Sequence, residues 1–153
     1  MGEPGVKGDD HMADRPQDPY VLEDQIGYVL RLASQRHAMI FQAHTIRNLT
    51  PTQFSALLRI HEQGKCSQNR LGRLAAMDVA TIKGVVDRLR EKGLTLAEPD
   101  PSDKRRTIIS LSEAGQALVD EMIEAGRRIT AETLRPLSGS EQRNLLKILK
   151  KIS

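Results

Sequence analysis

One stretch of the chain, Met77 to Arg106, limits the possible folds more than any other. It reads MDVATIKGVVDRLREKGLTLAEPDPSDKRR and joins an amphipathic helical pattern to two short apolar runs around a cluster of charge. Asp78 can cap the start of the helix, and Gly93 suits the left-handed conformation that commonly ends one. The apolar stripe between them consists of Ile82, Val85, Val86 and Leu89. The stretch therefore predicts a helix packed on a core and followed by a charged turn.

A shorter helix is predicted immediately before this one. The segment SQNRLGRLAAM places Leu71, Leu74 and Ala75 on one face, and at two or three turns it needs support from neighbouring elements. Two helices joined by a turn with almost no spare residues are typical of a helix-turn-helix. The runs LTLAE and TIISL, which flank the charged segment 99–106, have the composition of strands. A hairpin directly behind a helix-turn-helix is a wing.

Helices are predicted on both sides of this unit. Apolar residues recur at helical spacing over 21–47, which predicts one long helix. The sequence LTPTQF then starts a second helix, with a capping box formed by Thr50 and Gln53, which runs to about Glu62. Its apolar face is predicted to contain Phe54, Leu57 and Leu58 and to end at His61.

The chain after the wing is also predicted to be helical. Ser112 can cap a long helix that runs to about Leu134, and Pro136 stops it. Ser138 and Glu141 have the spacing of a capping box for a final amphipathic helix. The apolar face of that helix is made of Leu145, Ile148, Leu149 and Ile152.

These elements predict a mainly α fold with a small β-hairpin wing, in which a winged helix-turn-helix domain is flanked by long dimerisation helices. Residues 1–17 carry no apolar periodicity and are predicted to be a disordered tail or expression remnant. Residues 18–153 form a single domain, with the winged helix-turn-helix at 50–111. The helices at 18–48 and 112–153 expose more apolar surface than this domain can cover, which favours a homodimer.

Composition excludes several other classes of protein. No apolar run approaches the roughly 20 residues that span a bilayer, and no signal peptide is visible, so a cytoplasmic protein without membrane contact is expected. Cys66 is the only cysteine. The sequence contains no glycine-rich phosphate loop, no GxSxG motif and no metal-spaced histidines, so neither an enzyme nor a cofactor is predicted.

Positive charge is concentrated around the predicted helix-turn-helix. The segment 65–106 has ten Lys and Arg against six Asp and Glu, a net +4, whereas the whole chain has +3. A localised positive field favours double-stranded DNA as the partner. A nonspecific architectural DNA-binding protein is the nearest alternative, although such a protein should be basic throughout.

Particular residues of this region are predicted to contact DNA. When the Ile82 stripe faces the core, Ala80 and Gly84 point outward, and Thr81, Lys83 and Arg88 lie on the flanks, where they can reach base edges or phosphates. In the wing, Arg105 or its neighbours Lys104 and Arg106 can enter the minor groove, and Asp103 can orient an arginine. The start of the shorter helix can meet a phosphate through Ser67, Gln68 and Asn69.

Three segments resemble the MarR family of bacterial winged-helix repressors: LTPTQFSALLRI, NRLGRLAAMDVATIKGVVDRLREKGL and PDPSDKRRTIISLSEAG. The resemblance runs from about Asp18 to the end, and its most specific mark is the Asp-x-Arg of Asp103 and Arg105. It implies a MarR-type homodimer on a pseudo-palindromic operator, with 80–88 in the recognition helix. Gly84 departs from the larger polar residue common there. Within the family, the chain is most similar to repressors of nicotinate and related aromatic-acid degradation.

A small-molecule effector site is predicted among histidines on apolar helix faces. Buried histidines are costly unless they are paired, and together with a cation they can receive an aromatic carboxylate. The predicted residues are Arg31, Gln35, His37, Phe41, His44, Phe54 and His61. The alternatives are a zinc-responsive site, a redox response at Cys66, and a ligand-independent DNA-binding protein in which these histidines pack at the dimer interface.

Overall fold

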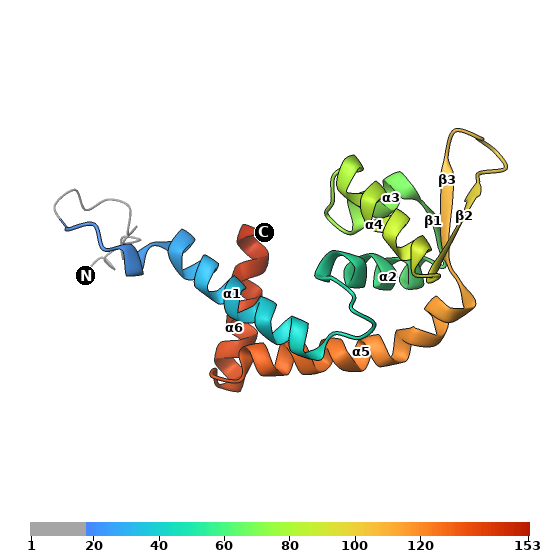
Figure 1. Cartoon of the computed structure of the whole chain (residues 1–153). Helices are drawn as coiled ribbons and strands as arrows, with labels where there is room; N and C mark the ends of the chain where they lie inside the picture. The colour runs from blue at the N-terminus through green and yellow to red at the C-terminus, as the bar shows by residue number, and fades with distance from the viewer. Residues whose placement is uncertain (1–17) are drawn as a thin grey trace, which may run out of the picture. The chain divides into compact units, whose positions relative to one another are not determined.

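The computed structural model describes residues 18–153; the predicted tail at 1–17 lies outside the described residues. The chain divides into a first unit that ends at Ser34 and a second unit, Gln35–Ser153. None of the helices within 18–153 has the length and apolar character that crossing a bilayer requires. The second unit holds the winged helix-turn-helix and the two C-terminal helices (Figure 1).

The first predicted helix is interrupted near its start. A single 3-10 turn, η2 (Leu22–Asp24), is followed by extended backbone at Gln25, and α1 (Ile26–His44) begins only after it. The helix also ends at His44, earlier than predicted, and Arg47 and Asn48 in the turn that follows adopt positive φ angles of 53° and 52°. The apolar side chains of the first unit, such as Ile26 and Val29, are exposed.

Helix α2 (Pro51–Gln63) begins as predicted. The Thr50 side chain accepts the backbone N–H of Gln53, and the Gln53 side chain accepts the backbone N–H of Thr50. Gln53, Phe54 and Leu57 are buried, whereas His61 is exposed. The prediction that His61 ends a buried face was therefore wrong, because the buried face ends at Ile60 and residues 61–63 are exposed.

The helix-turn-helix consists of α3 (Gln68–Leu74) and α4 (Val79–Glu91). Asp78 caps α4 by accepting the N–H of Thr81 at 2.7 Å, and Gly93 has a φ of 74° just beyond the helix. The two helices pack closely at Gly72, where a Cβ would lie 3.1 Å from both Ile82 Cγ2 and the Met77 carbonyl oxygen. A larger residue at 72 would push the helices apart.

The wing is part of a three-stranded antiparallel sheet. Strands β2 (Thr95–Pro99) and β3 (Thr107–Leu111) form the predicted hairpin, and β1 (Lys65–Ser67) adds a third strand beside β3, in the order β1-β3-β2. Cys66 lies opposite Ile109, and both are buried. Strand β1 was not predicted, since a run of three residues is too short to show the alternation of a strand. The strand fixes the start of α3 next to the wing.

Helix α5 (Glu113–Leu134) follows the sheet, with Ser112 as its N-cap, and α6 (Gly139–Ile152) follows with the predicted Ser138 and Glu141 capping box. In Figure 1, α5 starts beside the sheet and passes along α2, and α6 turns off at its far end. The core contains Leu57, Ile60, Leu71 and Ile82 from the helices and Ile109 from β3. By contrast, α6 buries none of its side chains.

Candidate DNA-binding interface

The first turns of α4 carry the residues that were predicted to meet a major groove. Ala80, Thr81, Lys83 and Arg88 are all exposed, as a recognition surface requires. Gly84 is half-buried, and open space surrounds the position that its Cβ would occupy. Lys83 is held by an ion pair to Asp87 at 2.9 Å, and this hydrogen bond lowers the pKa of the Asp87 carboxyl. Asp87 therefore keeps the Lys83 ammonium along the helix axis.

Val79 was not predicted as part of this surface. Its spacing of three residues from Ile82 is that of an apolar helix face, although the predicted stripe began only at Ile82. The side chain is nevertheless 70% exposed, at the first residue of α4. An exposed aliphatic side chain beside Thr81 is suited to contact the methyl group of thymine.

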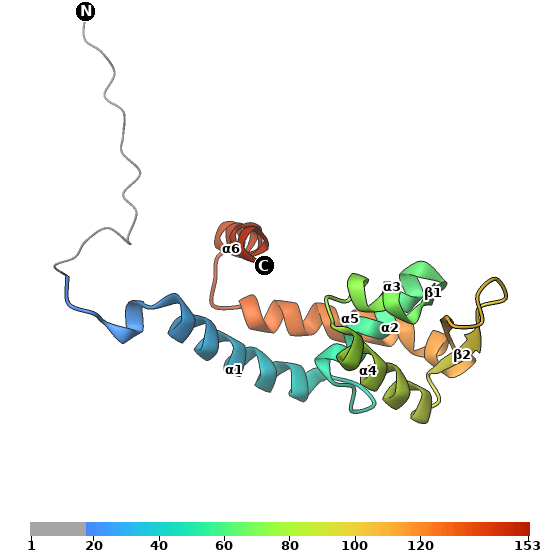
Figure 2. The same ribbon diagram turned by 90° about the horizontal axis from the view of Figure 1, so that it is seen from above.

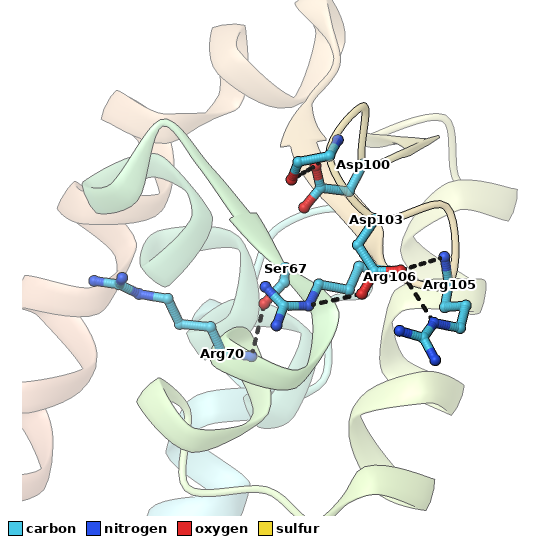
Figure 3. A network of polar contacts seen from close by, with 7 residues as sticks. Ser67, Arg70, Asp100, Asp103, Arg105 and Arg106 are labelled. Carbon is cyan, nitrogen blue, oxygen red and sulfur yellow. Dashed lines mark hydrogen bonds and ion pairs between the residues drawn. The ribbon is translucent and has the colours of Figure 1, made fainter.

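The wing arginines are arranged around one carboxylate. Asp103 pairs with Arg105 Nε at 3.2 Å through one oxygen and with Arg106 Nε at 3.7 Å through the other (Figure 3). The Arg105 side chain remains 92% exposed. Asp103 therefore orients two arginines instead of the single one considered from the sequence. Arg105 is the freer of the two to enter a groove.

The other acid of the wing shapes the loop. Asp100 accepts hydrogen bonds from the hydroxyl of Ser102 at 2.7 Å and from the backbone N–H of Ser102 at 2.9 Å. These bonds hold the pKa of the Asp100 carboxyl below its usual range. The backbone N–H of Asp100 in turn donates to the Arg106 carbonyl, which closes the loop beyond β2 and β3. Figure 2 shows this loop projecting beyond α3 and α4.

The wing and the start of α3 enclose a polar pocket of about 240 Å³. Its lining residues are Ser67, Gln68, Asn69, Arg73, Arg105, Arg106 and Thr107. In Figure 3, the Arg106 side chain extends from the wing toward Ser67, and Arg105 lies on the other side of Asp103. The structure thus brings together two groups that were predicted separately, and three arginines line a pocket where a DNA phosphate could sit.

Arg73 and Thr107 were missed in the sequence analysis. Neither belongs to a motif, and they reach the pocket only because β1 pairs with β3 and carries α3 to the wing. Ser67, which was predicted to face a phosphate, uses its hydroxyl to accept the N–H of Arg70 at 3.2 Å. The lone pair that caps α3 is therefore occupied, and Ser67 would contact a phosphate through its hydroxyl hydrogen.

Several predicted effector residues form a second cluster on α1 and α2. Phe41 packs edge-on against Phe54, with ring centroids 5.7 Å apart, and the centroid of His37 lies 6.5 Å from that of Phe41. His37 Nδ1 lies 2.9 Å from Thr133 Oγ1, and the neighbouring Arg36 donates to the Thr133 carbonyl. His37 therefore has the hydrogen-bonding partner that a histidine near an apolar cluster needs.

The remaining predicted effector residues lie elsewhere. His61 Nδ1 is 3.4 Å from Gln116 Nε2 near the start of α5, whereas His37 contacts its end, about 25 Å away at 1.5 Å per residue. The structure therefore does not bring His61 to His37. His44 is half-buried and Gln35 is exposed. Arg31, in the first unit, stacks on Tyr28 with its guanidinium carbon 5.3 Å from the ring centroid.

Phe54 also lines an apolar groove, here called the α2–α5 groove, with a volume of about 570 Å³. Its walls include Leu58, Met122, Ile123 and Leu134, and its polar side chains are Arg127, Thr130 and Gln142. Gly126 allows the ring of Phe54 to lie close, because a Cβ there would be 3.3 Å from Phe54 Cζ. The groove offers an apolar wall for a ring and a guanidinium for an anion.

The described residues give little support to a zinc-responsive site or to a redox response at Cys66. Within 18–153, no group of three or more His, Cys, Asp or Glu side chains is arranged to hold a metal ion. Cys66 is buried opposite Ile109, and burial raises the pKa of its thiol in spite of the smaller opposite effect of Arg70. A thiol with a raised pKa is a poor nucleophile at neutral pH.

Comparison with known proteins identifies the family. The MarR family model matches residues 49–107. Over 135 residues, the chain is 39% identical to the HTH-type transcriptional repressor NicR of Pseudomonas putida, covering 88% of this chain and 85% of that protein. The match extends beyond the helix-turn-helix into the flanking helices.

Solved structures agree in fold. A probable transcriptional regulator from Pseudomonas aeruginosa is 50% identical with a TM-score of 0.84, covering 87% of this chain and 100% of that one. BpsR of Bordetella bronchiseptica, whose structure concerns the regulation of its DNA binding by 6-hydroxynicotinic acid, is 36% identical with a TM-score of 0.83, covering 88% and 97%. These relatives are transcriptional regulators, and the chain belongs to the MarR family of DNA-binding transcriptional regulators.

Proposed function

We propose that this protein is a transcriptional repressor whose hold on its operator is released by a small aromatic acid of the hydroxynicotinate type. The observation that carries the proposal is the 36% identity over 88% of the chain to BpsR, whose DNA binding is regulated by 6-hydroxynicotinic acid. The similarity to the repressor NicR supports the same direction of control. Action on a chromosomal operator would place the protein in the cytoplasm.

A homodimer is part of this proposal. The exposed apolar side chains of α6, among them Leu146, Ile148 and Ile152, cover one face of an otherwise basic and polar helix. Similar exposed side chains occur separately in the first unit, at Ile26 and Val29. Surfaces of this kind are costly in water and are commonly buried by a second copy. A dimer would present two copies of α4 and of the wing to a pseudo-palindromic operator, in keeping with the proposed division into 18–48, 50–111 and 112–153.

The α2–α5 groove is the proposed effector site. The ring of an aromatic acid can lie against Phe54 and Met122, and its carboxylate can pair with the guanidinium of Arg127. That guanidinium pairs with Glu124 in the structure, so the acid would compete with this carboxylate. Phe41 and His37 adjoin this wall through the contact between Phe41 and Phe54. Of the other predicted residues, Gln35, His44 and Arg31 remain proposals for the surroundings, and His61 falls outside this site.

Arg127→Gln should weaken binding of 6-hydroxynicotinic acid by about ten- to a hundredfold, because a charge-assisted hydrogen bond contributes roughly 1.5–3 kcal/mol. Arg128→Gln is the matched control, since Arg128 is the exposed neighbour on α5 and does not line the groove. Isothermal titration calorimetry of both variants measures the difference. Equal affinities for the two variants would exclude Arg127 as the carboxylate partner.

Specific DNA recognition can be tested by selecting an operator from random double-stranded DNA and comparing it with scrambled DNA as salt increases. A regulator should keep its complex with the selected site at about 0.15 M salt, where nonspecific complexes have weakened strongly. If the affinities for the selected operator and for the scrambled DNA fell equally with salt, the protein would be an architectural DNA-binding protein and the proposed function would be wrong.

A further inference from the structure

The ammonium of Lys92 is bound at three points. Its Nζ donates to the carbonyl of Asn48 at 3.0 Å, to the side-chain oxygen of Gln53 at 3.1 Å and to the carbonyl of Arg47 at 3.3 Å. A lysine ammonium has three N–H donors and no acceptor. All three donors are therefore used within the protein, which is unusual for the side chain of a solvent-exposed lysine.

The three acceptors belong to one structural feature, the turn between α1 and α2. Arg47 and Asn48 are the residues with positive φ in the turn after α1, and Gln53 is the capping-box residue of α2. The Gln53 oxygen accepts from both the backbone N–H of Thr50 and Lys92. The same side-chain oxygen thus links the start of α2 to the lysine.

Lys92 itself is the C-cap of the recognition helix. Its backbone N–H donates to the Arg88 carbonyl at 3.0 Å, and Gly93 turns the chain directly after it. Gln53 is buried, and so is Leu49 within the turn. Because one acceptor is the buried Gln53 side chain and the other two adjoin the buried Leu49, a shift of the turn would be transmitted to the last turn of α4 through the ammonium.

A pocket lies beside the turn, between it and the end of α1. This pocket of about 340 Å³ is lined by Phe41, Gln42 and Thr45 from the end of α1 and its exit, and by Asn48, Leu49 and Thr50 from the turn. The pocket shares Phe41 with the aromatic cluster that adjoins the proposed effector site. The turn therefore connects the aromatic cluster to the residue that caps the recognition helix.

We infer that Lys92 is a positioning residue that couples the α1–α2 turn to the recognition helix, so that the state of the turn sets the placement of α4 on DNA. The inference rests on the proposed function, because it concerns how operator binding is regulated. It differs from a role as a phosphate-binding charge, since the ammonium is occupied by protein oxygens. Coupling of this kind is reciprocal, so operator binding must also change the stability of the turn.

Hydrogen exchange of the dimeric, full-length protein, with and without the selected operator, tests the inference without requiring the effector. The reporter amides are those of Leu49 and Phe54, which donate to the Ile46 and Thr50 carbonyls. In the wild-type protein, operator binding should slow their exchange by about tenfold, the effect of roughly 1.4 kcal/mol. In Lys92→Met, this slowing should disappear while the amides of the β2–β3 ladder remain protected.

Lys65→Met is the matched control, because it removes the same charge from an exposed lysine that forms only a surface ion pair with Glu98 at 3.3 Å. It should lose some DNA affinity and keep the operator-dependent slowing at the turn. A second variant, Gln53→Glu, keeps a capping-box residue and strengthens the acceptor for Lys92, so exchange at Leu49 should become slower even without DNA.

The outcomes separate the inference from the proposed function. Absence of any sequence-specific complex would contradict the proposed function. Formation of a specific complex that leaves the Leu49 and Phe54 amides unchanged would overturn the coupling alone. The coupling would be equally wrong if Lys92→Met retained the full slowing, or if Lys65→Met abolished it to the same extent.

Discussion

Replacement of Gly115 by alanine is expected to destabilise the protein by about 3 kcal/mol or more, at the upper end for overpacking substitutions. A Cβ at this position would lie 2.1 Å from the carbonyl oxygen of Leu94 and 3.1 Å from its carbonyl carbon. That oxygen also accepts the backbone N–H of Ser112, and the Ser112 hydroxyl donates to the Gly93 carbonyl. The backbone atoms cannot withdraw without breaking the junction between α4, the sheet and α5.

The effect has the opposite sign to the one that helix propensity predicts. Gly115 lies in the first turn of α5, where alanine would otherwise be favoured by up to about 1 kcal/mol. Gly84→Ala is the matched control, because a Cβ added at this position of α4 would meet no atom within 4 Å. It should raise the free energy of unfolding in urea. Similar stabilities for the two variants would contradict the close approach of α5 to Leu94.

Replacement of Arg105 by alanine should weaken DNA binding by about ten- to a hundredfold, the cost of roughly 1–3 kcal/mol expected for an arginine at a groove. The guanidinium is nearly fully exposed and is held at the tip of the wing by Asp103. Because the minor groove distinguishes little more than A·T from G·C pairs, the loss should be similar on operator variants that keep the A·T content under the wing. The slope of log affinity against log salt should also decrease by about 1.

Thr81→Ala provides the contrast within the same interface. Thr81 lies in the first turn of α4, so its loss should change the preference among operator sequences and leave the salt slope nearly unchanged. Affinities for a panel of operator variants at several salt concentrations would separate the two roles. An equal loss on every sequence for both variants would contradict the division between the wing and the recognition helix.

Much of the helical framework could be predicted because its signals are local. Thr50, Asp78, Ser112 and Ser138 each accept a backbone N–H three residues ahead, so each cap depends only on neighbouring residues. The break before α1 and the strand β1 could not be predicted in this way. The strand β1 exists because β3 is available to pair with it, which is a contact between distant parts of the chain.

The candidate sites show the same limit. The charge of the wing and the small residues of α4 are visible in the sequence, and the predicted DNA-binding residues of both are exposed except for the half-buried Gly84 and Asp103. The convergence of Arg73 on Arg105 and Arg106 depends on tertiary packing. His61 and His37 share a residue type and an apolar context, yet α5 holds their partners, Gln116 and Thr133, near opposite ends. Periodicity assigns a residue to one face of its helix, whereas the element that packs against that face depends on the tertiary structure.

Release of the operator by an aromatic acid is the property that defines the proposed repressor. Fluorescence anisotropy of the labelled operator bound to the wild-type protein at about 0.15 M salt would be followed during titration with 6-hydroxynicotinic acid, with benzoic acid and zinc as comparisons. We expect 6-hydroxynicotinic acid to dissociate the complex over the concentration range in which it binds the free protein, and zinc to leave the complex intact. A complex that persists when the acid is bound, or that zinc alone dissociates, would contradict the account.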